Sequence, residues 1–189
     1  EIKECDWSSD VCSSDLSFNT TGYENTAVGD LALSDNTTGY QNTANGDRSL
    51  SSNTTGFGNT ANGYKSLYND TTGSFNTASG YYALYSNTTG SSNTANGYYA
   101  LYTNNTGSYN TALGYQAYPS SGSLNNYTGI GFNVGGATSL SNMVELGNTS
   151  VTVIRGQVSP TTYSDARIKQ NVTENVPGLV FINKLRPVT

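Results

Sequence analysis

The sequence has no histidine, few charged residues and no long apolar run. The absence of histidine excludes most transition-metal sites and the nucleophile pairs that need a histidine base, and we expect no cofactor. Charged residues make up 11% of the 189-residue chain and the net charge is -5, so a basic surface for nucleic acid is missing. No apolar run approaches the roughly 18 residues of a membrane helix, which argues against membrane insertion.

The first sixteen residues differ in composition from the rest of the chain. They hold both cysteines, the single tryptophan and five of the thirteen acidic residues. The stretch from Asp6 to Leu16 matches the translation of a widely used short-read sequencing adapter. We therefore interpret residues 1–16 as an artefact that should make no contacts of the repeat type, and we expect the natural sequence to begin near Ser17.

From Ser17 to Tyr118 the chain is built from a 17-residue repeat. The motif Asn-Thr-Ala-x-Gly recurs at this spacing, at Asn25, Asn42, Asn59, Asn76, Asn93 and Asn110. A leucine recurs at the same spacing, at Leu33, Leu50, Leu67, Leu84 and Leu101, with Tyr118 in the sixth place. A second glycine, usually after Asn-Thr-Thr, recurs at Gly22, Gly39, Gly56, Gly73, Gly90 and Gly107. Self-similarity at a fixed period indicates stacked structural units.

The residue types in the repeat predict strands rather than helices. Glycine and asparagine oppose helix formation, whereas threonine, tyrosine and leucine between Asn/Gly turns favour short strands. We predict two strands per unit, at residues 26–29 and 31–34 in the first copy, with turns at Gly29-Asp30 and at residues 36–39. Stacked units would form an all-β fold, a parallel β-solenoid with coils about 4.8 Å apart.

The repeated positions also predict the interior of the solenoid. Alanine and leucine should point inward in register, as at Ala44, Ala61, Ala78, Leu50, Leu67 and Leu84. The repeated glycines suit positive φ at corners, and the equivalents of Asn25 should form a ladder in which each side-chain amide bonds the next. One alanine and one leucine per coil make a thin core. We therefore expect chains to associate and bury two stacked tyrosine files, one of Tyr64, Tyr81, Tyr98 and Tyr115 and one of Tyr68, Tyr85 and Tyr102.

Two segments of the repeat, NTAVGDLAL at residues 25–33 and NTALGYQAY at residues 110–118, resemble the head repeats of trimeric autotransporter adhesins. The resemblance rests on the spacing Ala-x-Gly-x-x-Ala and covers residues 17–118. It implies a left-handed parallel β-roll that assembles as a homotrimer at an extracellular surface. The unit of this chain is longer than the family's because it carries an Asn-Thr-Thr-Gly loop.

Beyond Tyr118 the repeat is no longer recognisable in the sequence. We interpret residues 119–163 as a Gly-rich β transition segment, in which residues 142–158 predict two short strands around a Gly-Asn turn. The first sequence of helical or basic character follows. There Ser164 would cap a helix that starts at Ala166, which gives a short C-terminal transition from strand to helix.

The hexapeptide SDARIK, which starts at Ser164, and the later LRPV resemble the start of the self-cleaving intramolecular chaperones of phage tail spikes and tail fibres, of which the endosialidase chaperone is the type. The resemblance implies that residues 164–189 are the truncated start of such a domain. It also implies that Ser164 is the nucleophile, that Lys169 is its general base and that the bond from Tyr163 to Ser164 is cleaved. So short a stretch cannot bury the lysine, so we expect no activity in this chain.

These observations predict a structural and receptor-binding fibre segment rather than a metabolic enzyme. It would belong to a phage tail fibre on the virion or to an adhesin on a bacterial cell surface. A cell-surface receptor or glycan would be its partner, and the tyrosine files could stack on sugar rings. The alternative is an ice-binding β-solenoid with a threonine file at Thr26, Thr43, Thr60, Thr77, Thr94 and Thr111. Sequences that match the glycosylation pattern occur at Asn19, Asn36, Asn53, Asn69, Asn87 and Asn104.

Overall fold

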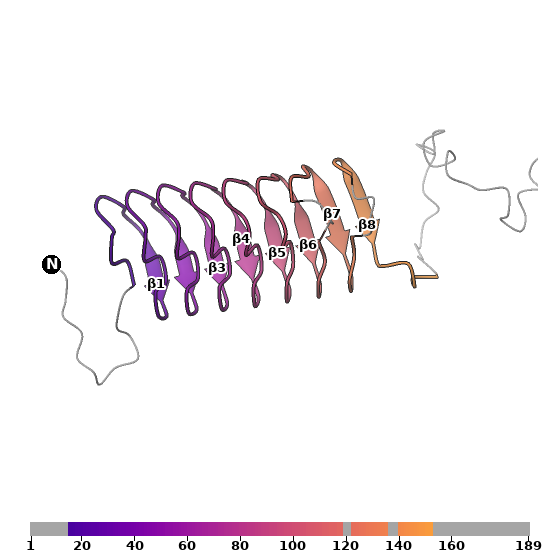
Figure 1. Ribbon diagram of the computed structural model, residues 1–189, viewed down its shortest axis with the longest axis horizontal. Helices are drawn as coiled ribbons and strands as arrows, with labels where there is room; N and C mark the ends of the chain where they lie inside the picture. Colours follow the sequence, from indigo (N-terminus) through magenta and orange to yellow (C-terminus); the bar gives the residue numbers. More distant parts are fainter. Residues whose placement is uncertain (1–14, 119–121, 136–139, 153–189) are drawn as a thin grey trace, which may run out of the picture. The chain divides into compact units, whose positions relative to one another are not determined.

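The computed structural model describes residues 15–118, 122–135 and 140–152, and of these residues all except Thr152 belong to one compact unit. Over these residues the chain is all-β. Its eight short strands are β1 (Thr26–Val28), β2 (Thr43–Asn45), β3 (Thr60–Asn62), β4 (Thr77–Ser79), β5 (Thr94–Asn96), β6 (Thr111–Leu113), β7 (Tyr127–Ile130) and β8 (Met143–Leu146). They form one sheet in sequence order, and every neighbouring pair is parallel (Figure 1). The predicted parallel β-solenoid is confirmed.

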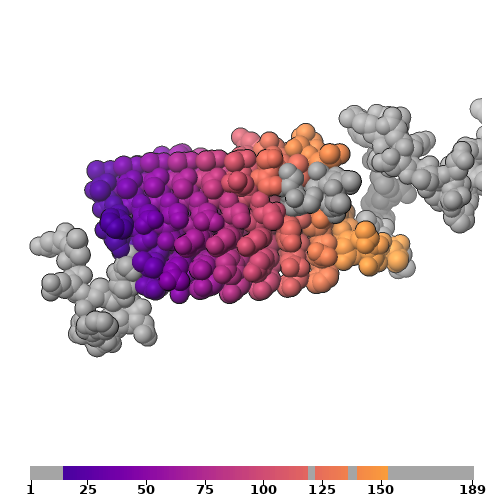
Figure 2. All heavy atoms as spheres, in the orientation of Figure 1, coloured from indigo at the N-terminus to yellow at the C-terminus, as the bar shows by residue number. Residues whose placement is uncertain are grey.

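Each coil stacks on the equivalent residues of the coil before it. Ala44 is paired with Ala61, and Ala61 with Ala78, so the register of the sheet is the 17-residue period of the sequence. The predicted inward alanines and leucines have no exposed surface. Figure 2 shows successive coils in direct contact along the face in view. Equal spacing is sufficient to set this register, because any other pairing would place side chains of unlike size in one layer.

Each coil contains one strand, not the two that were predicted. Residues 31–34 form a turn, in which Leu31 has φ 58° and Leu33 has φ 51°. Two left-handed residues in four cannot belong to an extended strand. Leucine rarely adopts this conformation, but at Leu33 the complete burial of the side chain offsets the backbone strain.

Glycine is required in the two glycine files for different physical reasons. From Gly29 to Gly131, at steps of 17 residues, the corner glycines have φ between 126° and 137°, as predicted. A Cβ at Gly80 would also lie 2.6 Å from the carbonyl oxygen of Gly97. The glycines that follow Asn-Thr-Thr, such as Gly39, do not have positive φ, and that part of the prediction is wrong. They are needed because a Cβ would collide with the carbonyl of the next glycine in the file.

The expected amide ladder at the Asn25 file bonds mainly to the backbone instead, and one amide-to-amide bond, from Nδ2 of Asn93 to Oδ1 of Asn76, accompanies it. The Oδ1 of Asn25 accepts the backbone N–H of Asn42 at 3.0 Å, and its Nδ2 donates to the carbonyl of Gly39 at 2.8 Å. Amide-to-amide bonding is the rule in the other asparagine file. There Nδ2 of Asn36 donates to Oδ1 of Asn19, and Nδ2 of Asn53 donates to Oδ1 of Asn36, both at 2.7 Å. These buried amides fill a large part of the interior.

The stack continues beyond Tyr118, where the sequence repeat fades. Strands β7 and β8 extend the sheet in register. At β7, Tyr127 takes the place of the repeated asparagine and is fully buried, and Gly129 takes the place of alanine. The glycine makes room for the ring, because a Cβ there would lie 2.7 Å from the Tyr127 hydroxyl. That hydroxyl donates to Glu145 of β8 at 2.8 Å.

Two residues assigned to the foreign leader belong to the coil structure. The N–H of Leu16 donates to the carbonyl of Ala32, its φ is 54°, and its side chain packs against the core. The side chain of Asp15 accepts a hydrogen bond from the N–H of Ala32. For these two residues the expectation of no repeat-type contact is wrong. The reason is that Leu16 precedes Leu33 by one period, so it occupies the leucine layer whatever its origin. Residues 1–14 lie outside the described part of the chain.

Candidate functional site: an aromatic face of the solenoid

The residues of the predicted cleavage site, Tyr163, Ser164 and Lys169, lie outside the described residues, as does the helix expected from Ala166. The dyad therefore stays a prediction. Across the described ranges, no three side chains of histidine, cysteine, aspartate or glutamate lie close enough together to hold a metal ion. The same ranges contain no helix that is long and apolar enough to cross a bilayer.

The asparagines of the predicted glycosylation pattern lie mostly inside the solenoid. Asn36, Asn53, Asn87 and Asn104 have no exposed surface. Both hydrogens of the Asn36 amide are used, because Nδ2 donates to Asn19 and to the carbonyl of Gly39. A glycosyltransferase cannot reach these amides in the folded chain. The pattern Asn-x-Thr arises here from a buried asparagine followed by turn residues.

One side of the solenoid carries a continuous set of aromatic rings, which we call the aromatic face. Its members are Tyr64, Tyr68, Tyr81, Tyr82, Tyr85, Tyr98, Tyr99, Tyr102, Tyr115 and Phe132. Both predicted tyrosine files stack. In the first, the rings of Tyr81 and Tyr98 have centroids 5.2 Å apart and planes within 5°. In the second, Tyr85 and Tyr102 are 5.3 Å apart and within 10°. Each coil thus repeats the ring position of the last.

A third file joins the two predicted ones. Tyr82 lies 4.5 Å from Tyr81 on one side and 4.8 Å from Tyr85 on the other, in edge-to-face contacts between ring centroids. One coil later, Tyr99 connects Tyr98 and Tyr102 in the same way, but with its ring tilted by 34° and 33° to theirs. This third file was not predicted from the sequence. The sequence feature that could have revealed it is the pair Tyr81-Tyr82, which recurs 17 residues later and places a second ring beside each ring of the first file.

The aromatic face contains little charge. The ammonium group of Lys65 lies 5.3 to 5.8 Å from the ring centroids of Tyr64, Tyr68 and Tyr82. A hydrogen bond to Tyr64 raises the pKa of Lys65, so the lysine stays charged and held over the rings. Burial raises the pKa of Tyr82, which keeps its phenol neutral. The face therefore presents ring edges and neutral hydroxyl groups.

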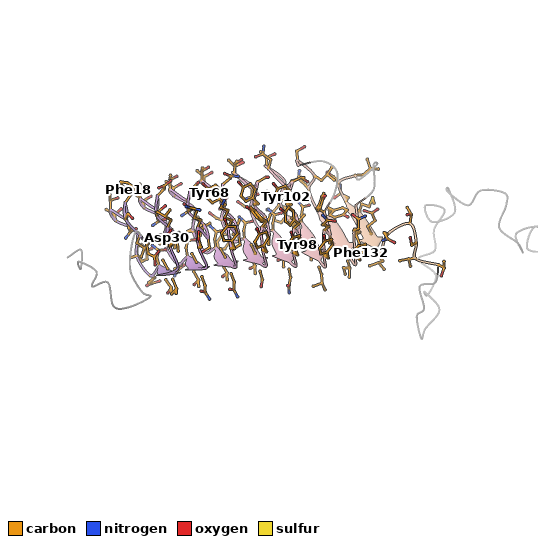
Figure 3. All side chains as sticks on the ribbon, turned by 60° about the horizontal axis from the view of Figure 1, so that its bottom comes forward. Phe18, Asp30, Tyr68, Tyr98, Tyr102 and Phe132 are labelled. Atoms are coloured by element: carbon orange, nitrogen blue, oxygen red, sulfur yellow. The ribbon has the colours of Figure 1, made fainter. Side chains whose placement is uncertain are left out.

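The first two coils carry aspartate where the later coils carry an aromatic ring of the first tyrosine file. Asp30 and Asp47 occupy the file that holds Tyr98 and Phe132 further along the chain. Figure 3 shows Asp30, Tyr98 and Phe132 in one row, beside a parallel row with Tyr68 and Tyr102. A smaller aromatic stack lies on another file of the early coils, formed by Tyr23, Tyr40 and Phe57, and Phe75 from the adjacent position contacts Phe57 edge to face.

The threonine file is exposed and regular. Each threonine is the first residue of its strand, and its Cα is paired with the threonine of the next strand. The exposed members are Thr26, Thr43, Thr60, Thr77, Thr94 and Thr111. Half-buried Thr128 continues the file at β7, and Val144 takes the position at β8. The outward side of the sheet thus has one threonine hydroxyl per strand over seven strands.

The buried amide ladder is interrupted where Asp70 replaces asparagine. Asp70 is fully buried, and its Oδ1 accepts a hydrogen bond from Nδ2 of Asn87 at 2.8 Å. Neither its Oδ2 nor the Oδ1 of Asn53 in the preceding coil has a hydrogen-bond partner. Burial raises the pKa of Asp70 to about 7, although hydrogen bonds from Asn87 and from the backbone of Gly73 oppose the rise. A proton on Oδ2 would let Asp70 donate to Asn53 as an asparagine does.

Comparisons of the chain with protein-family models, with curated proteins and with solved structures found no match.

Proposed function

We propose that this chain is a segment of a multi-chain surface fibre with a structural role and a role in attachment. The observation that supports the proposal best is the aromatic face, in which Tyr81, Tyr98 and Tyr115 each keep 43–44% of their surface exposed. A contiguous apolar surface of this kind on a soluble chain marks an interaction site. The stacked coils suit a shaft, because each coil bonds mainly to the coils beside it and can be repeated without a new fold.

The resemblances in the sequence support the same proposal. Residues 17–118 are similar to the head repeats of trimeric autotransporter adhesins, and the segment from Ser164 is similar to the start of a tail-fibre chaperone. The fibre would be a homotrimer on a virion or a bacterial cell surface, and its target a receptor or glycan. Sedimentation velocity over a wide concentration range tests the assembly. We expect a trimer, and a chain that stays monomeric at its highest soluble concentration would contradict the proposal.

The self-cleavage proposal concerns a parent chain with a complete C-terminal domain. There Lys169, with its pKa lowered by desolvation, would remove the proton from Ser164, whose oxygen attacks the carbonyl carbon of Tyr163. As the ester to the Ser164 oxygen forms, the peptide bond to the Ser164 nitrogen breaks and Lys169 returns the proton to that nitrogen. Water then hydrolyses the ester, which releases the Tyr163 carboxylate and the free Ser164 hydroxyl. Intact mass spectrometry should show cleavage in the parent, whereas Ser164→Ala and Lys169→Ala should each give uncut but assembled trimers. Cleavage of Ser164→Ala at the parent's rate would exclude the dyad.

A second candidate function is ice binding, which the exposed and regular threonine file favours. The file presents equally spaced hydroxyl and methyl groups on one side of the sheet. Thermal hysteresis of the intact chain tests this function directly. If the solenoid binds ice, Thr77→Lys should abolish the hysteresis, whereas Thr72→Lys, on an exposed turn away from the file, should not. The fibre proposal predicts no hysteresis in any of the three proteins.

A further inference from the structure

A second exposed apolar strip follows the strands just before the corner of the coil, after which the aromatic face begins. The strip consists of Leu113, Ile130 and Leu146, which are paired in register on β6, β7 and β8 and are 48%, 41% and 45% exposed. One corner glycine separates Leu113 from Tyr115, and another separates Ile130 from Phe132. Together the aromatic face and this strip form one surface, which we call the assembly face.

The stacking of the rings decides what kind of partner this surface fits. Tyr98 lies between Tyr81 and Tyr115 at centroid distances of 5.2 and 5.1 Å, with planes within 5° and 3°. Both faces of its ring are therefore covered by its neighbours. A planar ligand or a sugar ring needs an open ring face to stack on, and the file presents edges and hydroxyl groups instead. Ring edges arranged as parallel ridges fit another ridged surface.

The exposed area is close to what a protein interface requires. Tyr81, Tyr98, Tyr115 and Phe132 are 43%, 43%, 44% and 63% exposed, which leaves on the order of 400 Å² of aromatic surface. The aliphatic strip and the half-buried tyrosines add to this area. A standard interface takes about 800 Å² from each partner, so the assembly face supplies most of one interface.

The spacing and charge of the surface favour a second copy of this chain as the partner. Ridges that repeat once per coil match another surface over several coils only if that surface has the same period, and a copy of the solenoid has it. The aromatic files hold no carboxylate between Tyr64 and Phe132, so identical faces do not repel. Asp30 and Asp47 lie in the file of Tyr98. If two chains paired with one of them shifted toward its early coils, these carboxylates would face the rings of the other chain.

We propose that the assembly face is the contact between copies of this chain, an inference that rests on the fibre proposal and names its interface. The test uses substitutions that the solenoid already accepts at the same file positions. Tyr98→Asp copies Asp30 and Asp47, and Leu113→Asn copies Asn96. Tyr109→Lys is the matched control, because Tyr109 is 68% exposed on a different file.

Sedimentation velocity should show association of the intact chain, about 100-fold weaker association after Tyr98→Asp with Leu113→Asn, and no change after Tyr109→Lys. Circular dichroism checks that each variant keeps the β-sheet signal. Association that survives the double substitution, or that is lost in Tyr109→Lys, would overturn this interface but leave the fibre proposal standing. A chain that never associates would overturn both.

A second measurement avoids substitutions altogether. An equal mixture of ¹⁵N-labelled and unlabelled intact chains is oxidised with a photoactivated ruthenium complex and persulfate, which removes one electron and one proton from each of two phenols and joins their rings. Mass spectrometry then separates links between chains from links within one. Mixed-label dityrosines should contain Tyr81, Tyr98 or Tyr115. If they contain Tyr23 or Tyr109 instead, the interface lies elsewhere.

Discussion

The coils of β1 and β2 carry Asp30 and Asp47 directly after the corner glycine, whereas the coils of β3 to β6 carry tyrosine there. Inside, the same coils are alike, since Ala44 and Ala95 are both fully buried in one layer. An inward position is enclosed by two neighbouring coils, so its side chain can change in size only if a neighbour compensates, as Gly129 does for Tyr127. An outward position borders water and is free to vary. The difference shows that the inner half of the repeat maintains the fold, whereas the outer half can differ from coil to coil without changing it.

The strongest test of the difference between inner and outer positions places one charge inside a coil and one charge on the outside of the same coil. Leu67→Asp buries an unpaired carboxylate and should lower the free energy of unfolding by about 4 kcal/mol or more. Asn62→Asp, on the exposed side of β3, should change it by less than about 0.5 kcal/mol. Urea unfolding at neutral pH measures both. Equal losses in the two variants would show that the coil does not distinguish inside from outside.

Asp70, which interrupts the amide ladder, provides a test with an intermediate expected effect on stability. The pKa of Asp70 is about 7 in the folded chain and about 3.9 when unfolded. Between these values the folded chain binds more protons, so the contribution of Asp70 to stability falls as pH rises from about 4 to 7 and is constant above. The loss is about 4 kcal/mol at most.

Asp70→Asn should remove that dependence by restoring a donor to Asn53. The difference in unfolding free energy between the variant and the parent should therefore grow from pH 4 to pH 7, in favour of the variant. Chemical unfolding at a series of pH values measures it. Asp35→Asn, at an exposed position, is the control and should give a constant difference. A constant difference for Asp70→Asn as well would mean that Asp70 is charged in the folded chain.

The smallest effect is expected from extending the aromatic face into the early coils. Asp47→Tyr adds a ring one coil before Tyr64 and should raise the free energy of unfolding by about 0.5–1.5 kcal/mol through one more stacked pair. Thermal unfolding checks it. Thr72→Tyr adds the same side chain on an exposed file whose neighbouring coils carry threonine, and should have no such effect. If Asp47→Tyr is destabilising, the early coils differ from the later ones in backbone geometry and not only in their side chains.

Some of this structure could be predicted from the sequence, because a fixed period sets which residues of successive coils are paired. The layers of Ala44 and Leu50 follow from spacing alone, as do the two tyrosine files. The third aromatic file, at Tyr82 and Tyr99, was not predicted, because spacing does not say that neighbouring files touch. The buried site at Asp70 was not predicted either. In the sequence it is one more turn residue, and its raised pKa depends on a desolvation that only the coils around it produce.

By itself, the sequence determined the length of a coil, the parallel stacking and the identity of the core, because residues separated by one period must lie above one another. The tertiary structure alone decided the path of the chain within a coil. Positive φ at Leu31 and Leu33 replaces a second strand with a turn, and this turn is stable because the next coil buries the leucine. It also decided which asparagine file bonds side chain to side chain, and that Tyr127 and Gly129 together fill the layer after the repeat fades. Those outcomes depend on distances between neighbouring coils, which cannot be derived from the sequence of one repeat.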